Sequence, residues 1–245
     1  MSRKVVVISI QCRTVTLQSG SQRTCRANGL KYVWLEAGHD ELPNVIALPE
    51  FRHGGRPSIL EPVTMDDGCR YYRFRRNYGK IHAPRGVTVA LRTSESAFDA
   101  SRLFSAANLD RLCRVQGACI LFTHWTLARS LPVQDETIEN FQRLRAYRDQ
   151  GKIWVTRLSR LLEWTRLRTF LKYASTTAPD RLVIAIDSLD DPVFGRQELK
   201  ARDCDGLAFD IPPESGPIEI RIAGHVLPPE CVRRQGSTCW IRTPA

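Results

Sequence analysis

The most constraining feature of this sequence is an alternation of helical and strand-like segments between residues 105 and 170. Ser105 is a suitable N-cap, and the apolar residues after it recur every three or four positions, which predicts a helix over 106–115. The next segment, 118–123, is a continuous apolar run typical of a strand buried on both faces. Because such elements follow one another through short links ending in Gly, we expect a parallel sheet covered by helices, an α/β fold.

The alternation continues to residue 170. The spacing of apolar residues predicts a helix over 135–150 that Gly151 ends, then a strand at 153–155 and a last helix. A further strand is expected at 87–91, where it would join the parallel sheet. The positions expected to face the core from these two helices are Ile138, Phe141, Leu144, Tyr147, Leu158, Leu161, Leu162, Thr165 and Phe170.

The pattern changes after Pro179, where helical periodicity is lost. Short strand-like segments divided by Pro, Gly and Asp predict a small, mostly antiparallel β appendage over 179–245, with a domain boundary near Ala178. Residues 1–178 would then form the α/β domain, of which 1–65 are poorly defined, as in a truncated chain. The appendage's expected strands are 182–186, 206–211, 218–222 and 238–242, and Asp187, Asp190 and Asp191 are read as a solvated loop rather than a cation site.

The chain has 245 residues and a formal net charge of +10, which suits anionic partners but specifies no site. Its densest basic segment, 70–85, interleaves Arg and Lys with aromatic residues and contains no acid. Cations beside stacking rings are typical of single-stranded nucleic-acid binding. The same alternation also describes a strand with one buried face, or a rim for an anionic or sugar ligand. Since recognisable nucleic-acid motifs are missing, nucleic acid is not the expected partner.

The sequence contains no run of 18 apolar residues, so we expect no membrane-spanning helix. The apolar start Val5–Ile10 is shorter than the core of a secretory signal, which favours a cytoplasmic protein. Eight cysteines occur without a C-x-x-C or Cys/His zinc pattern. We therefore expect reduced, buried thiols, with a Cys231–Cys239 bridge across a hairpin as the alternative.

His124 is the leading candidate for chemistry. It directly follows the apolar run Cys119–Thr123, so we expect it at the C-terminal end of a parallel strand, the edge where α/β folds carry their active sites. An imidazole in that place can act as a general acid or base near neutral pH. The alternative is a hydrogen-bonded structural histidine beside Trp125.

A family resemblance is carried by these same residues. The segments Gly117–Trp125 and Gly151–Thr156, with a helix between them, resemble the closing part of polysaccharide deacetylase-like domains. The helix Phe104–Leu112 and the stretch Tyr72–Arg76 also look similar. The resemblance therefore covers about residues 70 to 165.

The resemblance implies a distorted or partial (β/α) barrel and the hydrolysis of an N- or O-acetyl group on a carbohydrate substrate. It also implies a divalent metal, zinc, held by one Asp and two His. The metal and a carboxylate base would activate water, and His124 would inherit the role of protonating the leaving group. The residues expected to bind the glycan are Trp125, Arg75, Arg76 and Tyr78.

The family's metal motifs are not found in this sequence. Asp66 and Asp67 stand in a turn-like Met-Asp-Asp-Gly setting rather than after an apolar strand, and the five histidines form no H-x-x-x-H. We therefore expect no bound catalytic zinc, as in a truncated or inactive member. The alternative function is a non-catalytic binding protein that uses a basic and aromatic surface for an anionic glycan or nucleic acid.

Overall fold

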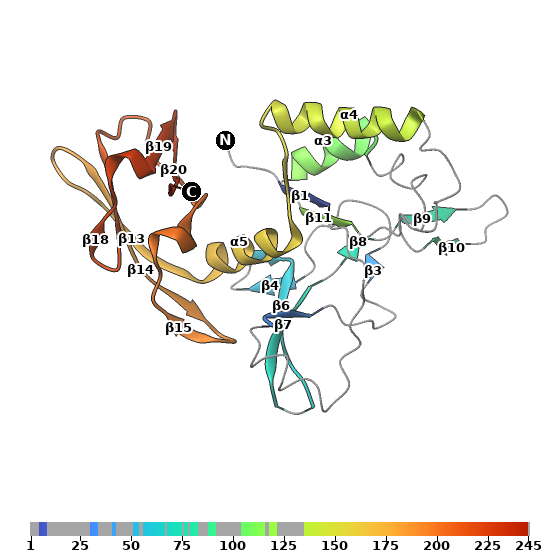
Figure 1. Cartoon of the computed structure of the whole chain (residues 1–245), viewed down its shortest axis with the longest axis horizontal. Helices are drawn as coiled ribbons and strands as arrows, with labels where there is room; N and C mark the ends of the chain where they lie inside the picture. Colours follow the sequence, from blue (N-terminus) through green and yellow to red (C-terminus); the bar gives the residue numbers. More distant parts are fainter. Residues whose placement is uncertain are drawn as a thin grey trace. The chain divides into compact units, whose positions relative to one another are not determined.

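The chain divides into two compact units, which are described separately: an N-terminal unit, Arg3–Leu162, and a C-terminal unit, Glu163–Ala245. Figure 1 shows the elements of both units in a computed structural model. The residues that the structure describes are 5–8, 30–33, 41–42, 51–53, 56–66, 68–74, 76–77, 79–82, 88–91, 104–115, 118–121 and 135–244.

A three-stranded parallel sheet organises the N-terminal unit. Its central strand is β1 (Val5–Ile8), which pairs in parallel with β11 (Ala118–Leu121) on one side and β12 (Trp154–Thr156) on the other. The expected parallel arrangement of the strands near 118–123 and 153–155 in one sheet is confirmed. The β-branched residues of β1 suit a central strand, because branched side chains pack well on a pleated surface.

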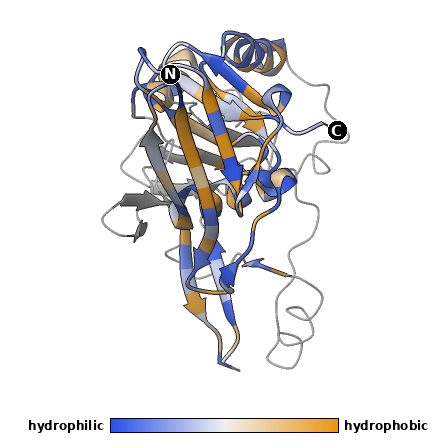
Figure 2. Cartoon of the chain, turned by 90° about the vertical axis from the view of Figure 1, so that its left-hand side faces the viewer, coloured by the Kyte–Doolittle hydropathy of each residue, from blue (hydrophilic) through white to orange (hydrophobic). Residues whose placement is uncertain are grey.

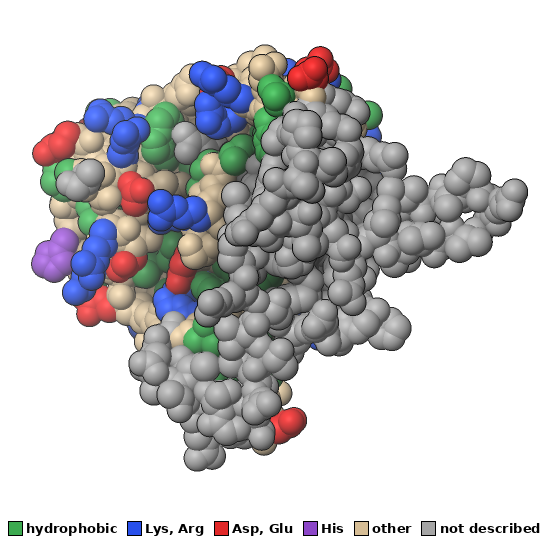
Figure 3. Space-filling model, turned by 45° about the vertical axis from the view of Figure 1, so that its right-hand side comes forward, with side chains coloured by type: hydrophobic (Ala, Val, Ile, Leu, Met, Phe, Trp, Pro, Cys, Tyr) green, Lys and Arg blue, Asp and Glu red, His purple; other side chains and the backbone are tan. Residues whose placement is uncertain are grey.

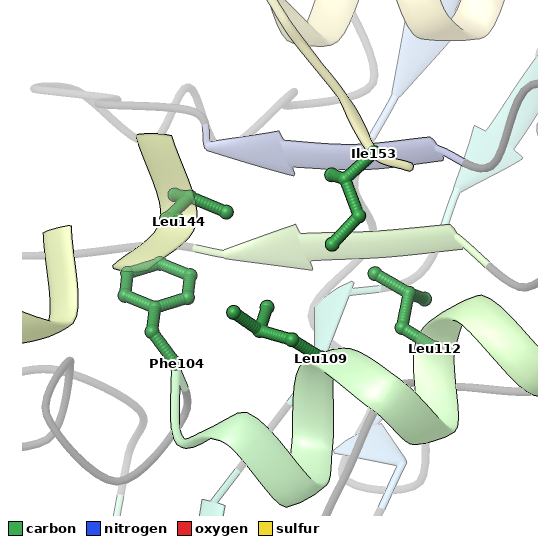
Figure 4. Packing of buried hydrophobic residues seen from close by; sticks show 5 residues of the cluster. All are labelled: Phe104, Leu109, Leu112, Leu144 and Ile153. Atoms are coloured by element: carbon green, nitrogen blue, oxygen red, sulfur yellow. The ribbon is translucent and has the colours of Figure 1, made fainter. Parts of the chain in front are cut away.

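Helices α3 (Ala106–Val115) and α4 (Asp135–Asp149) pack against this sheet. Ser105 caps α3 as predicted: its carbonyl accepts from the Leu109 N–H at 3.0 Å, and its Oγ accepts from the Asn108 N–H at 3.4 Å. Figure 4 shows five buried side chains that point toward one another and join the two helices to the strand region. This core cluster consists of Phe104, Leu109, Leu112, Leu144 and Ile153.

One expected core position of α4 is wrong. Ile138 is 44% exposed, whereas Leu144 is buried and Phe141 packs partly buried against the core cluster. A spacing of three drifts around a helix that turns every 3.6 residues, so a long series at that spacing leaves the buried face. In α4 the first residue of the series, Ile138, therefore lies outside the face that packs against the core cluster.

Gly151 ends α4 in the left-handed region, with φ of +68°. Its N–H donates to the Arg148 carbonyl at 2.8 Å, and the Lys152 N–H donates to the Tyr147 carbonyl at 3.0 Å. Nothing lies within 4 Å of the place that a Cβ would take. We expect Gly151→Ala to lower the free energy of unfolding by about 1–2 kcal/mol through backbone strain alone. Urea unfolding should show a smaller loss for Gly151→Asn, since Asn adopts this region more readily.

A second three-stranded sheet contains the hairpin of β6 (Leu60–Thr64) and β7 (Arg70–Phe74), with β2 (Tyr32–Val33) beside β7. Gly68, at φ of +78°, shapes the turn that joins β6 to β7. The remaining strands form two-stranded pairs: β3 (Glu41–Leu42) with β8 (Arg76–Asn77), β4 (Phe51–His53) with β5 (Arg56–Ser58), and β9 (Gly79–His82) with β10 (Thr88–Leu91).

One expectation about the sheet needs correction, and the expected partial or distorted barrel is not confirmed. The strand expected at 87–91 exists as β10, but it pairs antiparallel with β9 and does not join the parallel sheet. The described strands also form no closed barrel. In the parallel sheet β1 lies between β11 and β12, whereas consecutive strands of a (β/α) barrel are neighbours. The α/β class holds for the N-terminal unit.

The C-terminal unit is rich in strands, as expected for residues 179–245. Helix α5 (Leu158–Phe170) runs directly into β13 (Leu171–Thr177), which forms an antiparallel hairpin with β14 (Leu182–Asp191). One sheet has the order β13–β14–β17–β18, with β15 also paired to β14, and a second has the order β16–β20–β19. Their other strands are β15 (Gly195–Gln197), β16 (Ala208–Asp210), β17 (Ile218–Ile222), β18 (His225–Val226), β19 (Val232–Gln235) and β20 (Thr238–Ile241).

Most strand pairs of the C-terminal unit are antiparallel, with β14 and β17 as a parallel pair. Figure 2 shows the hydropathy of the strands of this unit, in which hydrophobic and hydrophilic residues both occur, and the buried apolar side chains of β14 include Leu182, Ile184 and Ile186. The expected boundary near Ala178 falls in the β13–β14 turn, where the Ala178 N–H donates to the Arg181 carbonyl at 2.8 Å. The units divide instead between Leu162 and Glu163.

Candidate functional site

The carboxyl edge of the parallel sheet is the place where this fold can present functional groups. Because β11, β1 and β12 run in parallel, their last residues, Leu121, Ile8 and Thr156, end at the same edge. Ligands of α/β sheets bind outside this edge, since the loops after the strands and the starts of the following helices meet there. The candidate site is therefore defined by these three strand ends.

His124 follows the last residue of β11 by three positions in the sequence. His124 and Trp125 lie outside the described residues, as do Arg75 and Tyr78. Arg76 begins β8, and its backbone is in register with that of Glu41 in β3. Of the predicted site at His124, the structure therefore describes the strand that precedes it in the sequence, β11.

Two polar residues at this edge were not predicted from the sequence. Thr156 ends β12 half-buried and in register with Val7 of β1, and the exposed Arg157 follows it. The Arg157 carbonyl accepts from the Leu161 N–H at 3.1 Å, so α5 begins at the sheet edge. The sequence signal that could have identified Thr156 and Arg157 was their position at the end of an apolar strand. A hydroxyl and a guanidinium there can donate hydrogen bonds to a polar ligand.

The aromatic residues of the basic segment are part of the fold. Tyr71, Tyr72 and Phe74 of β7 are buried, and the Tyr72 ring stacks on Tyr32 with centroids 6.2 Å apart. Arg73 pairs with Glu61 across the hairpin. These rings are thus not available as platforms for bases. The interpretation of this segment as a strand with a buried face is correct for β7. The strand is buried more fully than expected, because the consecutive residues Tyr71 and Tyr72, which lie on opposite faces, are both covered.

Surface charge gives no concentrated basic patch on the face drawn in Figure 3. Lys and Arg side chains there are interspersed with Asp and Glu over the described surface. Several form exposed ion pairs, such as Arg181 with Glu219 at 2.9 Å. Hydrogen bonds from Arg221, first, and from Arg181 hold the pKa of the Glu219 carboxyl below its usual value. On this face, the described cations are therefore accompanied by acidic side chains.

The residues expected to form a loop at the end of β14 belong to the strand instead. Asp191 is buried, and its Oδ2 accepts from Arg166 Nη1 at 2.6 Å. Its Oδ1 accepts from the backbone N–H groups of Val193, at 2.7 Å, and Phe194, at 3.0 Å. Asp187 and Asp190 are exposed. The prediction of a solvated loop at Asp191 is wrong, because its carboxylate is occupied by a buried guanidinium and two amides.

Within the part of the chain that the structure describes, no three His, Cys, Asp or Glu side chains gather closely enough to hold a metal ion. Asp66 lies in the β6–β7 turn, in a sheet other than the parallel one. The described residues therefore do not fit the zinc site that the resemblance implies.

Cys204, Cys231 and Cys239 are buried, and none of these three forms a disulfide. The expectation of reduced, buried thiols is confirmed for these three, and the alternative Cys231–Cys239 bridge is wrong. Burial, with a smaller effect of Asp203, raises the pKa of the Cys204 thiol to about 12. Burial also raises the pKa of Cys239. Protonated, enclosed thiols of this kind are poor nucleophiles at neutral pH.

No protein-family model matches this chain, and no curated protein or solved structure matches it either. Among the described helices, none has the length and apolar character needed to cross a membrane.

Proposed function

We propose that this chain is a polysaccharide deacetylase-like hydrolase domain that acts on an acetyl group of a glycan, with His124 as its general acid. The observation that carries the proposal is the position of β11. This strand is parallel to β12 in one sheet and ends at Leu121, three residues before His124. The order of strand β11, helix α4 and the Trp-containing strand β12 supports the proposal, because the family that the sequence resembles has the same order.

The proposed chemistry needs a proton at the leaving group. Hydrolysis of an acetamide adds water to the carbonyl carbon and breaks the C–N bond, and the departing amine must take up a proton. An imidazolium at the sheet edge can donate that proton near neutral pH, and the resulting neutral ring can be protonated again by solvent. For an O-acetyl group the same proton goes to the departing alkoxide. The proposal requires an open carboxyl edge and does not depend on barrel closure.

The other residues of the edge would bind the sugar. Trp125, adjacent in sequence to His124, would offer an apolar surface to a sugar ring. The hydroxyl of Thr156 and the guanidinium of Arg157 would donate hydrogen bonds to sugar hydroxyls or to the acetyl oxygen. These assignments place recognition and proton transfer at the ends of two strands of the same sheet.

The test is acetate release by the full chain from an N-acetylated chitooligosaccharide and from an O-acetylated xylan. We expect His124→Ala to lower kcat/KM by about 10²-fold or more, the usual scale for a general acid. The matched control is His225→Ala, since His225 is exposed on β18 in the C-terminal unit. The control should retain wild-type activity.

Thermal melts of the same variants separate catalysis from structure. If His124 donates the proton, His124→Ala should melt within a few degrees of the wild type. If it is a buried structural histidine, the same change should cost about 1–3 kcal/mol by leaving its partner unpaired. Equal activity of His124→Ala and wild type, or no acetate release from either substrate, would contradict the proposal; glycan binding without acetate release would support the non-catalytic alternative.

A further inference from the structure

Strand β13 has an unusual exposure for a member of a packed sheet. After Leu171, every residue of the strand is exposed, although its partner β14 is buried at alternate positions. Tyr173, Ser175 and Thr177 stand in register with Ile186, Ile184 and Leu182, in that order. Since residues in register point to the same face of a sheet, these three side chains extend the apolar face of β14 outward. We call Tyr173, Ser175 and Thr177 the β13 strip.

The aromatic ring of the β13 strip is held in place. The Tyr173 ring lies edge-on to Phe209 of β16, with centroids 5.2 Å apart and an interplanar angle of 65°. Phe209 is buried, whereas Tyr173 is 53% exposed. The contact orients the tyrosine ring while leaving much of its surface in water. A ligand that stacks on this ring therefore loses little side-chain entropy on binding.

The chemistry of the strip suits a neutral sugar. It offers one aromatic ring and two aliphatic hydroxyls, and it carries no charge of its own. A pyranose has an apolar C–H face that stacks on an aromatic ring and hydroxyls that exchange hydrogen bonds with Ser and Thr. Alternate residues of a strand are about 6.6–6.8 Å apart, so the strip extends for about 13 Å. This length accommodates more than one sugar ring.

A protein strand is a poorer match for the same edge. Lys172 is exposed on β13, and the register with β14 shifts between Lys172 and Tyr173. Lysines and bulges of this kind are features that protect edge strands from pairing with another chain. The side chains of Ser175 and Thr177 also provide no apolar row for a second strand to cover.

We propose that the β13 strip is a glycan-binding site of the C-terminal unit, which holds a neutral, N-acetylated polysaccharide. The nature of the ligand rests on the proposed function, whereas the existence of the site rests on the exposure, the ring geometry and the uncharged surface of β13. The site would retain a polymeric substrate and would take no part in the hydrolysis.

The decisive comparison uses two arginine substitutions on neighbouring exposed residues of β13. Ser175→Arg places a long cation in the strip, and Thr176→Arg places the same side chain on the opposite face of the strand. Binding of a soluble N-acetylated chitooligosaccharide to the full chain is measured by calorimetry. We expect Ser175→Arg to weaken binding about tenfold and Thr176→Arg to leave the Kd unchanged.

A second pair of variants tests the ring. Tyr173→Ala should weaken binding by a similar factor, and Tyr173→Phe should retain most of it, because the stacking surface and the contact with Phe209 remain. Equal affinities of Ser175→Arg and Thr176→Arg, or no binding by the wild type, would overturn the site. Acetate release measured in parallel keeps the proposals separate: binding without acetate release contradicts only the hydrolase, and acetate release without a difference between the arginine variants contradicts only the strip. A wild-type dimer that Tyr173→Ala converts to a monomer would assign the strip to self-association instead.

Discussion

Replacing Asp191 with alanine should lower the free energy of unfolding by about 3–5 kcal/mol. The Asp191 carboxylate and the Arg166 guanidinium form an ion pair at 2.6 Å, and their side chains are 0% and 5% exposed. Without the carboxylate, the cation of Arg166 stays buried and keeps its hydrogen bonds to Glu163 and Gln197. The amides of Val193 and Phe194 also lose their acceptor. A loss of this size is a large fraction of the stability of an ordinary domain.

The neighbouring residue provides the control. Asp190 is more than half exposed and lies 4.0 Å from Lys172, so Asp190→Ala should change the free energy of unfolding by no more than about 0.5 kcal/mol. Urea unfolding followed by circular dichroism measures both variants. The double variant Arg166→Met/Asp191→Leu should regain much of the loss, because apolar side chains replace both members of the buried ion pair. An Asp191→Ala protein as stable as Asp190→Ala would show that the pair does not form in solution.

Truncating Phe104 should produce a comparable loss in the N-terminal unit, about 3–5 kcal/mol for Phe104→Ala. Phe104 is 3% exposed, and its ring is tilted against that of Phe141 with centroids 5.5 Å apart. It packs in the core cluster with Leu109 of α3 and Leu144 of α4. Removing the ring therefore loses apolar burial and leaves a cavity where the two helices meet.

Ile138→Ala is the matched control for this core, since Ile138 is a large apolar residue of α4 that is 44% exposed. The control should unfold within about 0.5 kcal/mol of the wild type. Phe104→Leu should lie between the two, because it keeps part of the buried volume. If Phe104→Ala and Ile138→Ala unfold at the same urea concentration, the core cluster is not the one described.

The two candidate sites are the carboxyl edge of the parallel sheet and the β13 strip. Each depends on a strand that is supported by one of the two buried regions, the core cluster around Phe104 or the region of the Asp191–Arg166 pair. The strand that leads to His124, β11, lies beside the core cluster of the N-terminal unit, and β13 pairs with β14, whose end carries Asp191. Loss of either interior would disturb a site without touching its residues. Measurements of acetate release and glycan binding therefore need variants of proven stability.

The helical part of the fold could be predicted from the sequence. The bounds of α3, the cap at Ser105 and the end of α4 at Gly151 agree with the structure. These features depend on residues within a few positions of one another, through caps, turns and the 3.6-residue period. The parallel relation of β11 and β12 also followed, because a helix that crosses between two strands of one sheet requires it.

The position of β1 and the identity of β13 were decided by the tertiary structure. Val5–Ile8 belongs to the short apolar segment Val5–Ile10, and it becomes the central strand because Ala118–Leu121 and Trp154–Thr156, far away in the sequence, pair with its two edges. Leu171–Thr177 has no hydrophobic alternation, and it is a strand because β14 supplies its hydrogen bonds.

The same distinction holds for the functional residues. The sequence by itself determined that an imidazole, His124, follows an apolar strand, which is a local fact. It did not determine that the side chain of Tyr72 is buried or that Asp191 forms an ion pair with Arg166. It also did not determine that Tyr173 remains half exposed beside Phe209. Burial and charge pairing depend on which distant segments come together. Those contacts exist only once the chain has folded, so the tertiary structure alone separates the buried aromatic and acidic residues from the exposed ones.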